Sequence, residues 1–251
     1  MANLLRYVFV MLLALLGAVW LDRHHDVMVV KRQLFYEAQL VATLVRPDRA
    51  WWNEIGSTGV FLGAQPQYRL GHKTSLAHDL RINAVVTLLE DFEAEPGLWR
   101  HDPVTAREWH SLGVATHWVV ARDHLALNVS QLDSAVQRLI LHVAMDDRVY
   151  VHCKAGVGRS AQVVLAFLVR ARQWPLERAL GYLSAARPCV NIDAERSQAV
   201  LDYVAFAERR DAVDPRAAQD LAACRKVLQQ RAGARTPGAE REPAGRREQA
   251  Q

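Results

Sequence analysis

Cysteine is scarce in this chain of 251 residues, which has only Cys153, Cys189 and Cys224. They are odd in number and widely spaced, so the sequence has neither the pattern of a disulfide scaffold nor the spacing of a zinc finger. An excess of one charge is lacking too, because the formal net charge is only +4 and no dense basic stripe occurs. We therefore expect a reducing compartment and no nucleic-acid partner.

Internal repeats are also absent, while hydrophobic residues make up 51% of the chain. A chain of this length and composition forms one domain of ordinary size with extensions. We divide it into a membrane anchor at 1–25, a connector helix at 26–50, a folded domain at 51–210, and a charged, partly disordered tail at 211–251.

An uncharged apolar run at residues 7–21 dominates the N-terminal part of the chain. With Leu4 and Leu5 it approaches the ~17–25 residues that span a bilayer as a helix. A cleaved signal peptide and a buried core helix are the alternatives, although no small-x-small cleavage site follows the run cleanly. The run predicts a single-pass membrane anchor.

The basic residues around this run predict its orientation. Arg6 precedes the run, whereas Arg23, Lys31 and Arg32 follow it. Since positive charge is retained on the cytoplasmic side, we expect the larger C-terminal part to be cytoplasmic.

From Trp51 onward the pattern is that of an α/β domain. Strands are expected at 59–62, 84–89, 115–120 and 148–152, and helices around 132–143 and at 161–172, 176–186 and 197–209. Alternating strands and helices predict a mostly parallel central sheet flanked by helices. Residues 232–251 have almost no apolar side chains, which is typical of a disordered tail.

The most informative segment is the loop between the strand that ends at His152 and the helix that follows. It reads Cys153, Lys154, Ala155, Gly156, Val157, Gly158, Arg159, Ser160. The two glycines let the backbone curl so that its N–H groups point inward at a helix N-terminus, which is an anion site. A thiol placed there ionises more readily, and a guanidinium binds phosphate oxygens bidentately. The loop therefore predicts a phosphate site with a nucleophilic Cys153 and a clamping Arg159.

Attack of a thiolate on a phosphate ester leaves an alkoxide, so a general acid is needed. Asp123, in the loop after the strand at 115–120, is the best candidate. Asp133 is the rival but falls within a helical pattern, and Asp146 and Asp147 look like a surface turn. Ser160 can donate a hydrogen bond to the sulfur and help it leave in the second step.

The loop resembles that of the dual-specificity branch of the protein tyrosine phosphatases, and motifs at some distance from the loop resemble the mitochondrial-type phosphatidylglycerophosphate phosphatases. The resemblance covers roughly residues 51–207. The motifs that carry it are Trp51-Trp52-Asn53, Leu62-Gly63-Ala64, Glu90-Asp91-Phe92-Glu93, Val149 to Gly156, and Ser197-Gln198.

This resemblance implies a metal-free, cofactor-free phosphatase with Cys153 as nucleophile, Arg159 as phosphate clamp and Asp123 as acid. It also implies a phosphorylated lipid as substrate, most of all phosphatidylglycerophosphate. The chain departs from the family pattern at Val157, where a basic residue is usual, and at Ala121-Arg122-Asp123-His124. The first departure removes a charge from the pocket and the second adds one at its rim.

Other functions stay open on the sequence alone. A protein tyrosine or serine/threonine phosphatase uses the same loop on a phosphoprotein. A catalytically dead phosphate-binding module is a third reading, which the intact Cys153, Arg159 and Asp123 disfavour. Rhodaneses and arsenate reductases use similar loops, but the order of acid, cysteine and arginine fits dual-specificity phosphatases better. Lys154 contacts a second anionic group or solvent, and Cys189 is a buried hydrophobe or a disulfide partner of Cys153.

Overall fold

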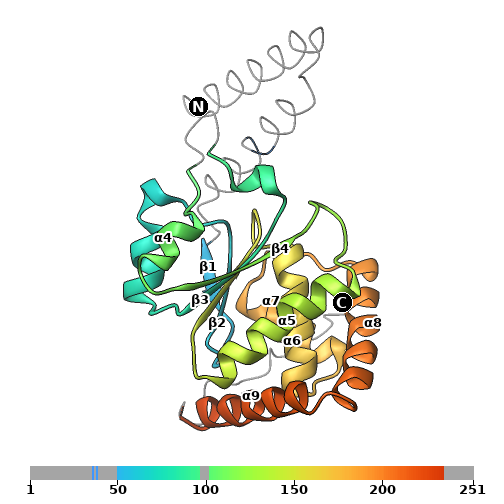
Figure 1. Cartoon of the computed structure of the whole chain (residues 1–251). Coiled ribbons are helices and arrows are strands. Elements are labelled where there is room, and N and C mark those ends of the chain that lie inside the picture. Colours follow the sequence, from blue (N-terminus) through green and yellow to red (C-terminus); the bar gives the residue numbers. More distant parts are fainter. Residues whose placement is uncertain (1–35, 37, 39–49, 97–101, 235–251) are drawn as a thin grey trace, which may run out of the picture.

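The computed structural model describes residues 36, 38, 50–96 and 102–234 (Figure 1). Within them, five strands form one sheet in the order β1-β2-β5-β3-β4. The strands are β1 (Trp52–Glu54), β2 (Val60–Gly63), β3 (Ala84–Leu89), β4 (Ala115–Val120) and β5 (Val149–His152). Only the β1–β2 pair is antiparallel, so the predicted mostly parallel sheet is confirmed.

Helices of ordinary length follow β4 and β5 and fill the C-terminal half of the described chain. They are α5 (Val129–Ala144), α6 (Arg159–Arg172), α7 (Leu176–Ala186), α8 (Ala194–Asp211) and α9 (Pro215–Ala234). The shorter elements are η1 (Tyr68–Leu70), α3 (His72–Thr74), η2 (Ser75–Asp79), η3 (Asp91–Ala94) and α4 (Ala106–His110). These short elements have too few residues for a helical periodicity to be read from the sequence.

The strands alternate their side chains between two apolar layers. Phe61, Val85 and Tyr150 pack on one face with Leu76 and Trp109 from the short helices. The neighbouring residues of the same strands point to the other face, which α5 and α6 cover, while α7 and α8 pack on these two helices (Figure 1). Because both faces of β3 are covered, all six of its residues are buried, as its continuous apolar run predicts.

The parallel strands β3, β4 and β5 all end at the same edge of the sheet. The segments that follow them are η3 after β3, the loop that holds Asp123 after β4, and the loop that holds Cys153 after β5. In open α/β sheets, ligands bind at this edge. The topology alone thus brings three loops together that are far apart in the sequence.

The folded domain extends beyond the end predicted at residue 210. Helix α9 buries Ala217, Leu221, Cys224 and Leu228, and the last three of these belong to the main core. Its apolar residues recur at three- and four-residue intervals, but many charged residues lie between them, and the segment therefore looked like the start of a polar tail. Residues 235–251 lie outside the described residues.

The predicted membrane anchor at 1–25 lies outside the described residues, as does most of the connector at 26–50. Of the connector, Tyr36 and Ala38 are described, and both are helical. Over the described part of the chain, no helix combines the length and the apolarity that crossing a bilayer requires.

Candidate active site

The loop after β5 turns sharply at Gly156, whose φ is +67°. A side chain at this position would place its Cβ 2.4 Å from the backbone carbonyl of Gly63, at the end of β2. Left-handed backbone and this close approach both require glycine. The first glycine of the motif therefore lets the loop lie directly against the sheet.

Every carbonyl of the loop from Cys153 to Gly158 accepts a hydrogen bond from a neighbouring group of the protein. The donors are, in order, His152 Nδ1, the Gln65 amide, Arg187 Nη2, Arg187 Nε, the Asn191 amide and the Gln162 amide. The carbonyls are thereby turned outward, and the backbone amides of Gly156 and Ser160 donate to the Cys153 sulfur. This backbone geometry fits an anion cradle.

Arg187 holds the outer side of the loop and was not predicted from the sequence. The side chain is 1% exposed and donates to Gly156 O at 2.8 Å and to Ala155 O at 3.2 Å. It also donates to the side-chain oxygen of Asn53 in β1 at 2.7 Å. Its partners lie more than 30 positions away in the sequence, so no local pattern marks it.

Cys153 lies at the bottom of the pocket and is 3% exposed. Ser160 Oγ donates a hydrogen bond to its sulfur at 3.2 Å. Burial opposes ionisation, but Arg159, Ser160 and the Gly156 amide together hold the pKa of Cys153 below its ordinary value. Cys153 is a free thiol, as is the half-buried Cys189. The site therefore favours the thiolate form of Cys153.

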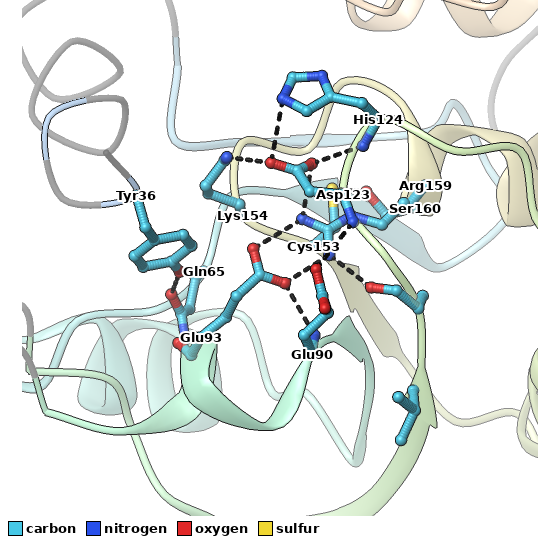
Figure 2. A network of polar contacts seen from close by, with 12 residues as sticks. Tyr36, Gln65, Glu90, Glu93, Asp123, His124, Cys153, Lys154, Arg159 and Ser160 are labelled. Atoms are coloured by element: carbon cyan, nitrogen blue, oxygen red, sulfur yellow. Dashed lines mark hydrogen bonds and ion pairs between the residues drawn. The ribbon is translucent and has the colours of Figure 1, made fainter. Parts of the chain in front are cut away.

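Arg159 comes from the first turn of α6 and is 2% exposed. Its two terminal nitrogens bind the carboxylate of Glu93 at 2.5 and 3.0 Å, and one of them also donates to Ala121 O at 2.8 Å. Burial works against the cation, but Glu93 and the thiolate hold the pKa of Arg159 above its ordinary value. Figure 2 shows the guanidinium fixed between Glu93 and Asp123.

The carboxylate of Asp123 reaches the same place from the loop after β4. It forms an ion pair with Arg159 at 3.0 Å and accepts a hydrogen bond from Lys154, and His124 lies 3.4 Å away (Figure 2). Burial raises the pKa of Asp123, but Arg159 and Lys154 outweigh it, so this pKa lies below its ordinary value. The rival Asp133 pairs with Arg210 instead.

His152, the last residue of β5, supports the loop in its neutral form. Burial lowers its pKa to about 4. Its Nδ1 lies 3.2 Å from the carbonyl of Cys153, so this nitrogen carries the proton, and Nε2 accepts from the Thr87 hydroxyl at 2.9 Å. Because neutral His152 adds no positive charge beside the sulfur, Arg159 is the cation that stabilises the thiolate.

Tyr36, from the predicted connector, reaches the same network. Its hydroxyl donates to the side-chain oxygen of Gln65, whose amide nitrogen donates to Glu93 O at 2.8 Å (Figure 2). The ammonium of Lys154 lies 5.3 Å from the centre of the tyrosine ring. Tyr36 is 2% exposed, so a residue N-terminal to the folded domain completes one side of the site.

A pocket of about 310 Å³ opens above the thiol. It is lined by Asp123, His124, Cys153, Lys154, Ala155, Val157, Gly158, Arg159, Asn191 and Arg196. The structure thus brings together the predicted catalytic residues and most of the predicted loop. Asn191 and Arg196 were not predicted, because neither belongs to a recognised motif, although Arg196 directly precedes the Ser197-Gln198 pair. Within the described residues, no group of three or more His, Cys, Asp or Glu side chains could hold a metal ion.

Comparisons with known proteins agree with this geometry. Residues 70–205 match the family model of the dual specificity phosphatase catalytic domain. Human phosphatidylglycerophosphatase and protein-tyrosine phosphatase 1 is 33% identical over 168 residues, which are 64% of this chain and 79% of the human protein. The Arabidopsis thaliana phosphatidylglycerophosphate phosphatase PTPMT1 is 29% identical over 68% of this chain and 49% of its own length.

A solved structure of PTPMT1 in complex with PI(5)P superposes with a TM-score of 0.57 at 27% identity. The match covers 64% of this chain and 99% of the PTPMT1 chain. The resemblance seen in the motifs is thereby confirmed over about two thirds of the chain. This chain belongs to the dual-specificity phosphatase family, and it is a phosphatase related to the phosphatidylglycerophosphate phosphatases.

Proposed function

We propose that this protein hydrolyses a phosphomonoester through a phosphocysteine intermediate. Cys153 is the nucleophile, Arg159 the phosphate clamp and Asp123 the general acid. The backbone amides of residues 154–160 bind the phosphoryl oxygens. These amides include those of Lys154, Ala155, Val157 and Ser160. The observation that carries the proposal is a buried thiol of lowered pKa at the centre of a loop whose carbonyls all face outward.

In the first step, the Cys153 thiolate attacks phosphorus and the bond from phosphorus to the ester oxygen breaks. The protonated carboxyl of Asp123 gives its proton to that oxygen, so an alcohol leaves instead of an alkoxide. The loop amides and Arg159 stabilise the charge on the three equatorial oxygens.

In the second step, water attacks the phosphocysteine and the phosphorus–sulfur bond breaks. The Asp123 carboxylate takes the proton of this water, and inorganic phosphate leaves. Ser160, whose hydroxyl already donates to the sulfur, stabilises the departing thiolate. The same contact thus serves the resting enzyme and the end of the cycle.

The lowered pKa of Asp123 favours its carboxylate form, whereas the first step needs the protonated form. A bound phosphate dianion places negative charge beside Asp123 and competes for Arg159. Both effects raise the pKa of a carboxyl group. The substrate itself therefore prepares the acid, and Asp123→Asn should lower turnover of alkyl phosphates by ~10²–10⁴-fold.

As substrate we propose phosphatidylglycerophosphate or a similar phospholipid. The names of the human and Arabidopsis relatives and the lipid headgroup in the PTPMT1 complex support this class. We further propose that residues 7–21 anchor the chain in a membrane, with the catalytic domain cytoplasmic. Tyr36 supports this arrangement, because it ties the segment that follows the apolar run to the catalytic pocket.

A protein phosphatase is the second candidate, since the name of the human relative includes protein-tyrosine phosphatase. Phosphate release from phosphatidylglycerophosphate, a phosphoinositide and phosphopeptides distinguishes the two. With lipids presented in vesicles, we expect the highest kcat/KM for phosphatidylglycerophosphate. Much faster hydrolysis of phosphopeptides would refute the lipid proposal.

Two N-terminal deletions test the proposed anchor. Removal of residues 1–25 leaves Tyr36 in place, so hydrolysis of a soluble aryl phosphate should persist while hydrolysis of lipid in vesicles falls. Removal of residues 1–46 also deletes Tyr36 and should lower activity on both substrates. Unchanged vesicle activity after the shorter deletion would show that the apolar run is not needed for membrane substrates.

A further inference from the structure

Arg196 lines the catalytic pocket although the mechanism above gives it no role. It lies in the first turn of α8, and its side chain is 10% exposed. One terminal nitrogen pairs with Asp193 and the other donates to His124 O at 2.7 Å. Its backbone amide donates to Asp193 Oδ1 at 2.8 Å.

The third side-chain nitrogen of Arg196, Nε, is buried and has no hydrogen-bond partner in the described structure. It lies next to the loop, because a Cβ on Gly158 would be 3.5 Å from it. A buried donor without a partner costs free energy, and such a group calls for an explanation. At the rim of an anion cradle, an incoming acceptor provides one.

The loop has an uncharged side chain between its two glycines, at Val157. Val157 stands where the resembled phosphatases usually have a basic residue. The Asn191 amide binds Val157 O at 2.9 Å and so ties the segment before α8 to the loop at this residue. The N-terminus of α8 adds a positive helix end at the same place. The first turn of α8, with Arg196, thus brings positive charge to the loop beside Val157.

We propose that Arg196 forms a second anion subsite, which binds the phosphodiester of a substrate whose phosphomonoester lies above Cys153. The inference rests on the proposed function, because it assigns a substrate with two phosphate groups to the same pocket. Guanidinium groups suit this role, since they donate to phosphate oxygens in a fixed geometry. Asp193 and the His124 carbonyl take the two terminal nitrogens, so Nε is the side-chain donor that is left for a ligand.

The subsite predicts discrimination between two lipids that differ in their second phosphate. Phosphatidylglycerophosphate carries a phosphodiester beside its phosphomonoester, whereas phosphatidic acid carries the phosphomonoester alone. The former can pair with Arg196 Nε, and the latter leaves this donor buried and unpaired. The enzyme should therefore prefer the first lipid, and this preference should depend on Arg196.

The test compares kcat/KM of Arg196→Gln with wild type on short-chain forms of both lipids and on an aryl phosphate. A hydrogen bond to a charged group is worth ~10- to 100-fold, so the preference for phosphatidylglycerophosphate should fall by about this factor. The loss should appear mainly in KM, and Arg196→Lys should restore part of it. Arg209→Gln, an exposed arginine on the same helix, is the matched control and should leave the preference unchanged.

Equal losses on all three substrates would overturn the proposal, because they would show that Arg196 only holds Asp193 and the His124 carbonyl. Both lipids are also tested as competitive inhibitors of aryl phosphate hydrolysis. Their inhibition constants are defined whether or not the lipids are turned over. No phosphate release from phosphatidylglycerophosphate would refute the proposed substrate alone. If Arg196→Gln leaves the ratio of the inhibition constants of the two lipids unchanged, the subsite is refuted.

Discussion

The ion pair between Glu93 and Arg159 offers a quantitative test of how the clamp is positioned. Glu93 is fully buried, Arg159 is 2% exposed, and two hydrogen bonds of 2.5 and 3.0 Å join them. Glu93→Gln keeps the shape of the side chain but removes its charge. In the variant, the positive charge of the buried Arg159 guanidinium is no longer balanced by the carboxylate of Glu93.

Breaking a buried pair by removing one partner costs ~3–5 kcal/mol. Arg159 keeps Asp123 at 3.0 Å and the Ala121 carbonyl at 2.8 Å, so the lower end of this range applies. We therefore expect Glu93→Gln to lower the free energy of unfolding by ~3 kcal/mol. Turnover should fall as well, because the guanidinium loses its fixed orientation.

Urea unfolding followed by circular dichroism measures the loss of stability, and phosphate release from an aryl phosphate measures the loss of activity. Glu95→Gln is the matched control, since Glu95 is exposed in the same segment. Such a surface change alters stability by at most ~0.5 kcal/mol. If both variants unfold at the same urea concentration, the buried pair does not hold Arg159 as described here.

Three further predictions concern the loop and its acid. Gly156→Ala should abolish activity, since the new Cβ would lie 2.4 Å from a backbone carbonyl, whereas Gly181→Ala, which meets no atom within 4 Å, should retain it. Lys154→Met removes one cause of the lowered pKa of Asp123, so the protonated acid should persist to higher pH and the basic limb of kcat/KM should move upward; an unmoved limb would argue against Asp123 as the acid. Ser160→Ala removes a donor to the nucleophilic thiol, so the pKa of that thiol should rise, and the pH midpoint of its alkylation by iodoacetamide should rise with it; a midpoint at the same pH in both proteins would refute this role.

Local signals in the sequence were sufficient for the strands and for the chemistry of the loop. The buried run of β3 was predicted with its exact bounds, and the two glycines marked the turn after β5. The resemblance placed Asp123 near the loop. These features depend on neighbouring residues, and neighbouring residues are what a sequence pattern records.

Contacts between distant segments were not predictable in the same way. Glu93 was noted only as part of a motif that carries the resemblance, and nothing in that motif showed that it is fully buried against Arg159, 66 positions away. Arg187 and Arg196 belong to no recognised motif, and only the folded chain brings them to the loop. Helix α9 was missed for a related reason. Its apolar stripe is narrow, and its packing against α5 is a contact between distant segments.

The most direct test of the central claim is to trap the covalent intermediate. Rapid acid quench of the wild-type enzyme during turnover, followed by mass spectrometry, should show one phosphoryl group on the peptide that contains Cys153. Cys153→Ser should form no phosphocysteine and should release no phosphate, whereas Cys189→Ser should behave as wild type. Continued phosphate release by Cys153→Ser would contradict the account.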